Sequence, residues 1–146
     1  MRKFNFKLQN ILDIREKLEL EQKNILTKAA SEYQQLLSRK DDNIQKVILS
    51  REIIYSQMKT TEVSIQSLRN LDHLQVQVNQ LTRSLDPQIE EKFKKMEQER
   101  VKYNKLVKDK KSIEILKNNE LKKYKIAQQR ALVSDMDEIA RNFTKN

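Results

Sequence analysis

His73 is the only histidine in a chain of 146 residues that has no cysteine. Histidine is well suited to acid–base catalysis near neutral pH and is a frequent metal ligand. A zinc site needs three or four protein ligands, and a general acid or base needs positioned partners that the sequence does not place around His73. We therefore expect a surface histidine, no metal site and no cofactor.

The charged side chains are spaced for ion pairing and not for catalysis. Glu90 and Lys94, like Glu91 and Lys95, stand four residues apart, which suits salt bridges on a helix. The sequence has no carboxylate dyad, no nucleophile motif and no phosphate-binding loop, and the tight turns of such motifs need glycine, which the chain lacks. The sequence predicts a protein that is not an enzyme.

The elements that carry these side chains must be long helices. The chain has no glycine and a single proline, Pro87, so it lacks most residues that make tight turns, end helices or stop them. Its remaining composition, 35% charged and 5% aromatic, suits helices better than strands. This composition predicts an all-α protein.

Apolar residues recur in steps of three and four in both halves of the chain, as in coiled coils. The expected seam of the first half is Ile11, Ile14, Leu18, Gln22, Ile25, Ala29, Tyr33, Leu37, Ile44, Val47, Arg51, Ile54 and Met58. The expected seam of the second half is Ile89, Phe93, Met96, Arg100, Tyr103, Val107, Lys110, Ile113, Tyr124, Ala127 and Ala131. We expect a long antiparallel two-helix coiled-coil hairpin that forms a single domain over residues 1–146.

The weakest helical stretch, residues 59–64, is the expected turn. It contains adjacent β-branched threonines, and Thr61 or Ser64 could cap a new helix. The first helix would span about residues 5–58 and the returning helix about 65–142.

Pro87 leaves two alternatives for the returning arm. Asp86 and Pro87 read as an N-cap followed by a first helical residue. The arm is therefore expected either to break there or to continue as one kinked helix.

The net charge of +9 comes from one segment. Residues 92–130 carry 14 Lys and Arg against 5 Asp and Glu, whereas residues 1–91 carry 14 against 13. The candidate basic face consists of Lys92, Lys95, Lys102, Lys105, Lys111 and Lys122. It is either a solvated helix face or a surface complementary to an acidic channel. No zinc-finger, homeodomain or RNP-like motif accompanies the charge, so nucleic acid is not an expected partner.

The N-terminal run, residues 1–7, is basic, but no uninterrupted apolar segment follows it. No stretch approaches the roughly 20 apolar residues of a membrane span. The absence of cysteine suits a reducing compartment. These features favour a cytoplasmic, soluble protein.

The two ends of the chain carry the most specific patterns. The opening run contains Phe4, Phe6, Leu8, Gln9, Ile11, Leu12, Ile14, Arg15, Glu16 and Glu19, and the closing run is Met136-Asp137-Glu138-Ile139-Ala140 with Phe143 close behind. Both runs resemble those of FliJ-family proteins of the bacterial flagellar export apparatus. Total length and the hairpin plan also match, whereas the middle of the chain is generic coiled coil.

The resemblance implies a stalk similar to the central subunit of rotary ATPases. Such a protein binds the flagellar export ATPase hexamer, promotes its assembly and activity, contacts the cytoplasmic domain of the membrane-embedded export gate and engages export chaperones. It would be largely monomeric in isolation and peripherally associated with the cytoplasmic membrane through the export apparatus.

The same resemblance assigns candidate contact residues at each end of the hairpin. Candidates for the ATPase-ring contact at the open end are Phe4, Phe6, Ile11, Met136, Asp137, Glu138, Ile139 and Phe143. Candidates for the gate or chaperone contact near the turn are Leu71, Leu74 and Val78.

Each set also has a plainer explanation. Phe4 and Phe6 could simply staple the helix start. The apolar row at the C-terminus, which comprises Met136, Ile139, Ala140 and Phe143, could self-associate or fold back onto them. The stripe near the turn is expected to pack mainly on the first helix. Two other functions also remain: the stalk of a virulence type III secretion system, or a structural coiled-coil adaptor that dimerises through its seam.

Overall fold

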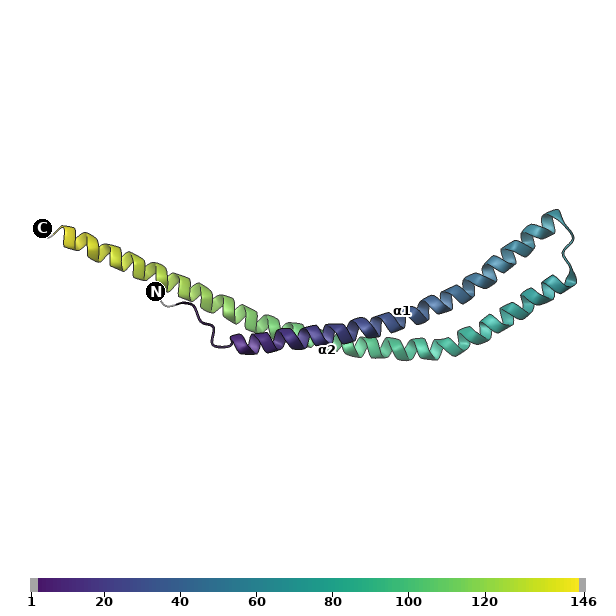
Figure 1. Cartoon of the computed structure of the whole chain (residues 1–146), viewed down its shortest axis with the longest axis horizontal. Coiled ribbons are helices and arrows are strands. Elements are labelled where there is room, and N and C mark those ends of the chain that lie inside the picture. Colours follow the sequence, from purple (N-terminus) through teal and green to yellow (C-terminus); the bar gives the residue numbers. More distant parts are fainter. Residues whose placement is uncertain (1–2, 145–146) are drawn as a thin grey trace. The chain divides into compact units, whose positions relative to one another are not determined.

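The computed structural model of the chain describes residues 3–144. It contains two helices, α1 (Gln9–Thr60) and α2 (Ile65–Phe143), and no strand occurs among these residues (Figure 1). The two helices pack against each other as the antiparallel arms of a hairpin. The predicted all-α, two-helix hairpin is confirmed.

The chain reverses at residues 61–64 without any glycine. None of the described residues has a positive φ, so the turn needs no left-handed position. The Oγ of Ser64 accepts a hydrogen bond from the backbone N–H of Ser67 at 3.2 Å. This is the N-cap geometry that satisfies one of the free N–H groups at a helix start.

α1 begins at Gln9, later than the expected start near residue 5. The preceding residues are not helical, and the N–H of Gln9 bonds the carbonyl of Phe6 at 3.1 Å. Phe6 is buried, and the ring of Phe4 packs against that of Tyr124 on α2, with centroids 5.5 Å apart. These ring contacts hold the segment along α2, which accounts for the later start.

α2 runs through Pro87 without a break, so the alternative with a divided returning arm is not the one observed. Proline has no N–H, and the carbonyl of Arg83 therefore loses its helical donor. Packing across the hairpin compensates for this loss. Leu85 is buried, and Asp86 pairs with Lys40 of α1 at 2.7 Å.

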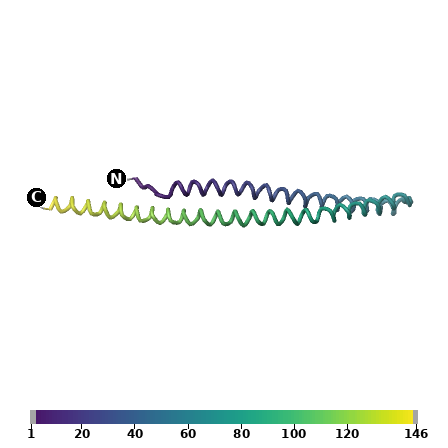
Figure 2. The backbone as a smooth tube through the Cα atoms, turned by 90° about the horizontal axis from the view of Figure 1, so that it is seen from below, coloured from purple at the N-terminus to yellow at the C-terminus, as the bar shows by residue number. Residues whose placement is uncertain are grey.

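Contacts divide the chain into two compact units. Unit 1, described over residues 3–21 and 103–144, holds both ends of the chain, and unit 2, residues 22–102, holds the turn. Each unit contains a piece of α1 lying beside a piece of α2 (Figure 2). Each unit is described separately below.

The α1 side of the seam in unit 1 is shifted by one residue from the prediction. Leu12 is 3% exposed, whereas its neighbour Ile11 is 43% exposed. Ile14 and Leu18 are exposed as well, and Arg15 and Glu19 face α2 in their place. The shift follows from ion pairs across the seam, which the apolar pattern alone does not reveal.

Unit 2 follows the predicted seam more closely. Ala29 and Val47 are buried as expected, and the rings of Tyr33 and Phe93 lie 5.5 Å apart. Phe93 is nevertheless 43% exposed. Other expected seam residues are exposed in the structure as well: Ile25, Ile44, Arg51, Met58 and Arg100 in unit 2, and Ala127 and Ala131 in unit 1.

Candidate partner-binding surfaces

The interior of unit 1 is rich in polar contacts. The Nζ of Lys110 lies 2.8 Å from the Oε2 of Glu19, and the Nζ of Lys117 donates a hydrogen bond to the Oε1 of Gln9 at 2.8 Å. Arg15 pairs with Asp109 of α2 at 3.4 Å. These directional contacts fix the register of the two helices. They also leave apolar side chains of α1 on the outside.

Unit 2 has equivalent polar contacts among its apolar ones. The Nζ of Lys92 lies 2.9 Å from the Oε2 of Glu32 on α1. The side-chain amide of Gln22 donates hydrogen bonds to the backbone carbonyl and the carboxylate of Glu99. Lys92, a member of the candidate basic face, is therefore engaged within the hairpin.

These contacts shift the pKa values of four side chains. The hydrogen bond and charge of Lys92 lower the pKa of Glu32, and the hydrogen bond from Gln22 lowers that of Glu99. The bonded carboxylate of Glu32 raises the pKa of Lys92, and that of Glu19 raises the pKa of Lys110. All four shifts favour the charged forms, so the polar seam is most stable when each group is ionised.

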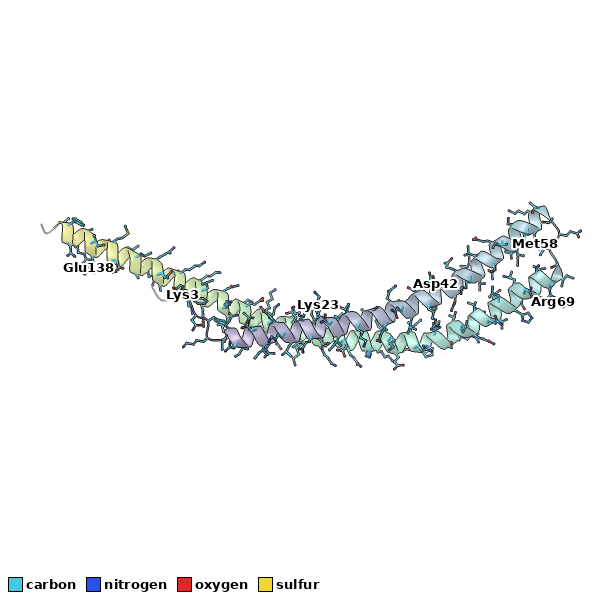
Figure 3. The ribbon with its side chains drawn as sticks, viewed as in Figure 1. Lys3, Lys23, Asp42, Met58, Arg69 and Glu138 are labelled. Atoms are coloured by element: carbon cyan, nitrogen blue, oxygen red, sulfur yellow. The ribbon has the colours of Figure 1, made fainter. Side chains whose placement is uncertain are left out.

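The C-terminal part of α2 has no partner helix. Every described residue from 129 onward is exposed, yet the helix continues to Phe143. Glu138 lies in this stretch, where side chains project on all sides of the ribbon (Figure 3). Phe143 is 80% exposed and Met136 68% exposed. With Ile139 they form the C-terminal stripe, an apolar row at helical spacing that nothing in unit 1 covers.

The three carboxylates of this stretch, Asp135, Asp137 and Glu138, are also exposed. Negative charge near a helix C-terminus opposes the helix dipole, so local stability does not account for them there. They would instead be free to contact a partner beside the C-terminal stripe.

The N-terminal candidates occupy different environments. Phe6 is buried and Phe4 is half-buried against Tyr124, so both rings take part in the packing of unit 1. Ile11 is exposed on the outer side of α1, close to Ile14. Of the candidates in this segment, Ile11 alone presents a largely accessible side chain.

A groove lies near the turn in unit 2, between the end of α1 and the start of α2. It is lined by Ile53 and Ile54 of α1, Leu71 and Leu74 of α2, and the polar residues Ser50, Gln57, Ser67 and Asn70. Leu71 and Leu74 are half-buried at its edge. Val78, the third candidate there, is buried and belongs to the packing of the two helices.

The remaining members of the candidate basic face differ in their contacts. All of them are exposed: Lys95, Lys102, Lys105, Lys111 and Lys122. Lys102 also pairs with Glu99 at 3.3 Å. His73 is exposed as well. No group of three or more potential metal ligands gathers within residues 3–144. In that same part of the chain, no helix is long and apolar enough to cross a membrane.

The fold and its surfaces define a class of protein: a long helical hairpin with a polar-rich seam and apolar side chains left exposed at its open end. The family model for the flagellar FliJ protein matches residues 4–145, so the chain belongs to the FliJ family, components of the flagellar export apparatus. No curated protein and no solved structure matches it significantly.

The apolar spacing of α1 predicts Ile11, Ile14 and Leu18 in the seam, whereas all three are exposed in the structure. The sequence does carry a sign of this rotation, because a charged residue directly follows both Ile14 and Leu18. Arg15 and Glu19 recur at the same spacing as the apolar row, and α2 carries Asp109 and Lys110 at matching positions. Pairing of these charges across the hairpin would have revealed the shift.

Proposed function

We propose that this chain is the non-enzymatic stalk of the flagellar export apparatus. It binds and activates the ring of the export ATPase, links that ring to the export gate and engages export chaperones. It works in the cytoplasm as a largely monomeric protein and is peripherally associated with the membrane through the apparatus. Membership of the FliJ family supports a role in the flagellar export apparatus. The exposed apolar surfaces support the proposed contacts with other proteins of that apparatus.

The observation that carries the ATPase contact is the uncovered C-terminal stripe. Met136, Ile139 and Phe143 are more than half exposed on a helix that continues beyond its partner. An amphipathic helix of this kind binds by laying its apolar row into a groove of another protein. The neighbouring Asp137 and Glu138 would add charge contacts that set orientation.

The groove lined by Leu71 and Leu74 is the proposed site for the gate or a chaperone. Its lining combines four apolar with four polar residues, a mixture found in protein-binding surfaces. It lies in unit 2 and the C-terminal stripe lies in unit 1, so the two contacts use different surfaces.

ATP hydrolysis by the export ATPase of the same organism tests the ring contact directly. Adding the intact chain should stimulate hydrolysis and ring assembly, and the double variant Met136→Ser with Ile139→Ser should abolish most of that gain. The matched control is Leu49→Ser with Val101→Ser, two residues of similar exposure in unit 2. Absence of stimulation by the folded chain, or equal loss in both variants, would refute the proposal.

A further inference from the structure

Between residues 105 and 130, one side of α2 in unit 1 carries cations and no carboxylate. Its charged residues are Lys105, Lys108, Lys111, Lys122, Lys123 and Arg130, all exposed. They recur in steps that keep them on the side of the helix away from α1, opposite Lys110 and Lys117. We call this the lysine-rich outer face. None of these six side chains forms an ion pair with another described residue.

The carboxylates of the same stretch are directed elsewhere. Asp109 pairs with Arg15 of α1, and Glu114 lies 3.9 Å from the seam residue Lys110. Glu120 is exposed on the flank of the helix, one turn from Lys117 on the α1 side and one turn from Lys123 on the outer face. The outer face therefore has one carboxylate at its border and none among its six cations.

Large apolar side chains lie among these cations. Ile115, Leu116 and Ile126 are 51%, 42% and 49% exposed. Ile115 and Leu116 lie between the two groups of lysines, and Ile126 lies between Lys123 and Arg130. Such a face has the composition of helices that lie in the plane of a membrane interface, with apolar residues at the acyl boundary and lysines among the headgroups. Lysine stems can also cover apolar surface while the ammonium groups reach outward.

The identity of the cations argues against a protein or nucleic-acid partner. Protein interfaces favour Arg, Tyr and Trp and are depleted in Lys, whereas five of the six cations here are lysines. Single-stranded nucleic acid is held by stacking on aromatic rings. The tyrosines of this stretch, Tyr103 and Tyr124, are half-buried on the α1 side of the helix. A diffuse array of hydrated ammonium groups suits a layer of phosphate headgroups better.

We propose that the lysine-rich outer face docks on an anionic phospholipid bilayer. The contact is direct and does not depend on the proposed ATPase or gate contacts. It also leaves the C-terminal stripe accessible: Ile139 follows Lys110 by about eight helical turns and so lies on the opposite side of α2 from the outer face.

Co-sedimentation of the full chain with vesicles tests the docking. Vesicles of phosphatidylcholine with phosphatidylglycerol should bind the chain, vesicles of phosphatidylcholine alone should not, and added salt should release it. Each lysine near an anionic membrane contributes about 1 kcal/mol, which is roughly fivefold in affinity. The variant Lys122→Gln with Lys123→Gln should therefore bind roughly 30-fold more weakly.

The matched control is Lys23→Gln with Lys46→Gln, which removes the same charge from exposed positions of α1 in unit 2. It should retain nearly all of the vesicle binding. A third variant, Ile126→Ser, should bind more weakly than the intact chain although its charge is unchanged. Circular dichroism should show that each variant keeps its helical content.

Three outcomes would overturn the proposal. They are absence of binding to the anionic vesicles, equal binding to both kinds of vesicle, and equal loss in the face variant and its control. Retention of duplex DNA by the same lysines, with the vesicles left unbound, would also reject it and make the face a nucleic-acid site. The co-sedimentation assay contains no ATPase, so a failure of the proposed stalk function would not change the vesicle binding that it measures.

Discussion

The ammonium of Lys110 lies 2.8 Å from the carboxylate of Glu19, inside the seam that joins α1 to α2 in unit 1. An ion pair at such a position specifies which residues face each other, although its net contribution to stability is usually smaller than that of a well-packed apolar pair. Together with Arg15 and Asp109, it fixes the rotation of α1 about its own axis.

The polar seam should make stability depend on pH at both ends of the scale. The lowered pKa of Glu32 and Glu99 means that their stabilisation is present above the ordinary value of 4.5 and is lost as pH falls through the folded-state pKa. The raised pKa of Lys92 and Lys110 means that their stabilisation is present below 10.5 and is lost as pH rises through the folded-state pKa. Thermal unfolding followed by circular dichroism should show a plateau of Tm between these limits.

The variant Glu32→Gln provides the control for the acid side. It removes one of the shifted carboxylates, so its Tm should fall less steeply with decreasing pH than that of the original chain. An unchanged slope would show that this pair does not couple protonation to folding.

Replacing either of two neighbouring residues near the start of α1 by alanine should change the free energy of unfolding by very different amounts. Leu12→Ala removes a buried side chain and should lower the free energy of unfolding by about 2 kcal/mol or more. Ile11→Ala removes an exposed one and should change it by less than about 0.5 kcal/mol. Urea denaturation measures both values. The reverse order of effects would favour the seam predicted from sequence over the observed one.

This pair of residues also shows what could be predicted from sequence. The lack of glycine and the 3–4 spacing indicate the hairpin, and the threonine-rich stretch indicates the turn, because both depend on local preferences. The rotation of α1 could not be predicted from hydrophobicity, since Ile11, Ile14 and Leu18 form the more apolar row. Cross-helix pairing of Arg15 and Glu19 decides it, and such pairing depends on the register of residues far apart in the chain.

The candidate surfaces were predictable to different degrees. The C-terminal stripe could be predicted, because its apolar residues have helical spacing in a segment of the second helix that extends beyond the first helix. For Phe6 and Val78 the sequence leaves two roles open, because an apolar residue at helical spacing is compatible with either a contact surface or a core position. Both are buried in the structure, which leaves Ile11 as the accessible candidate of the N-terminal segment and the half-buried Leu71 and Leu74 as the candidates near the turn.

Pro87 should lower the stability of α2. Replacement by Ala restores the N–H that the carbonyl of Arg83 lacks and removes a poor helix former from an exposed position. We expect Pro87→Ala to raise the free energy of unfolding by about 1–3 kcal/mol. Gln88→Ala, at the exposed neighbouring position, should change it by less than about 0.5 kcal/mol. A loss of stability in Pro87→Ala would indicate that the proline favours the observed packing of Leu85.

The groove near the turn should affect export separately from ATPase activation. Leu71→Ala combined with Leu74→Ala should reduce export of flagellar proteins and leave stimulation of the ATPase largely intact. Ile53→Ser changes an exposed residue of the same groove and should reduce export with little cost in stability. Secretion assays and ATP hydrolysis are measured in parallel.

Leu85→Ala provides the stability control for this experiment, because Leu85 is buried in unit 2 outside the groove. It should destabilise the fold without the same loss of export at permissive temperature. If Leu85→Ala reduces export as much as the groove variants do, the export defect of the groove variants results from lost stability and not from a lost contact. Parallel loss of ATPase stimulation and export in Ile53→Ser would argue against two separate contact surfaces.

The antiparallel pairing of α1 and α2 has a kinetic consequence. The bonded residues Arg51 and Gln75 are separated by 24 positions in sequence, whereas Gln9 and Lys117 are separated by 108. Closing a loop costs more entropy as it lengthens, although slowly, so contacts near the turn can form before those near the chain ends. Pairing of the two helices should therefore begin near residues 61–64 and proceed toward the chain ends. Amide hydrogen exchange should be fastest near those ends, where the helices pair last. A partner bound there would stabilise the contacts that form last.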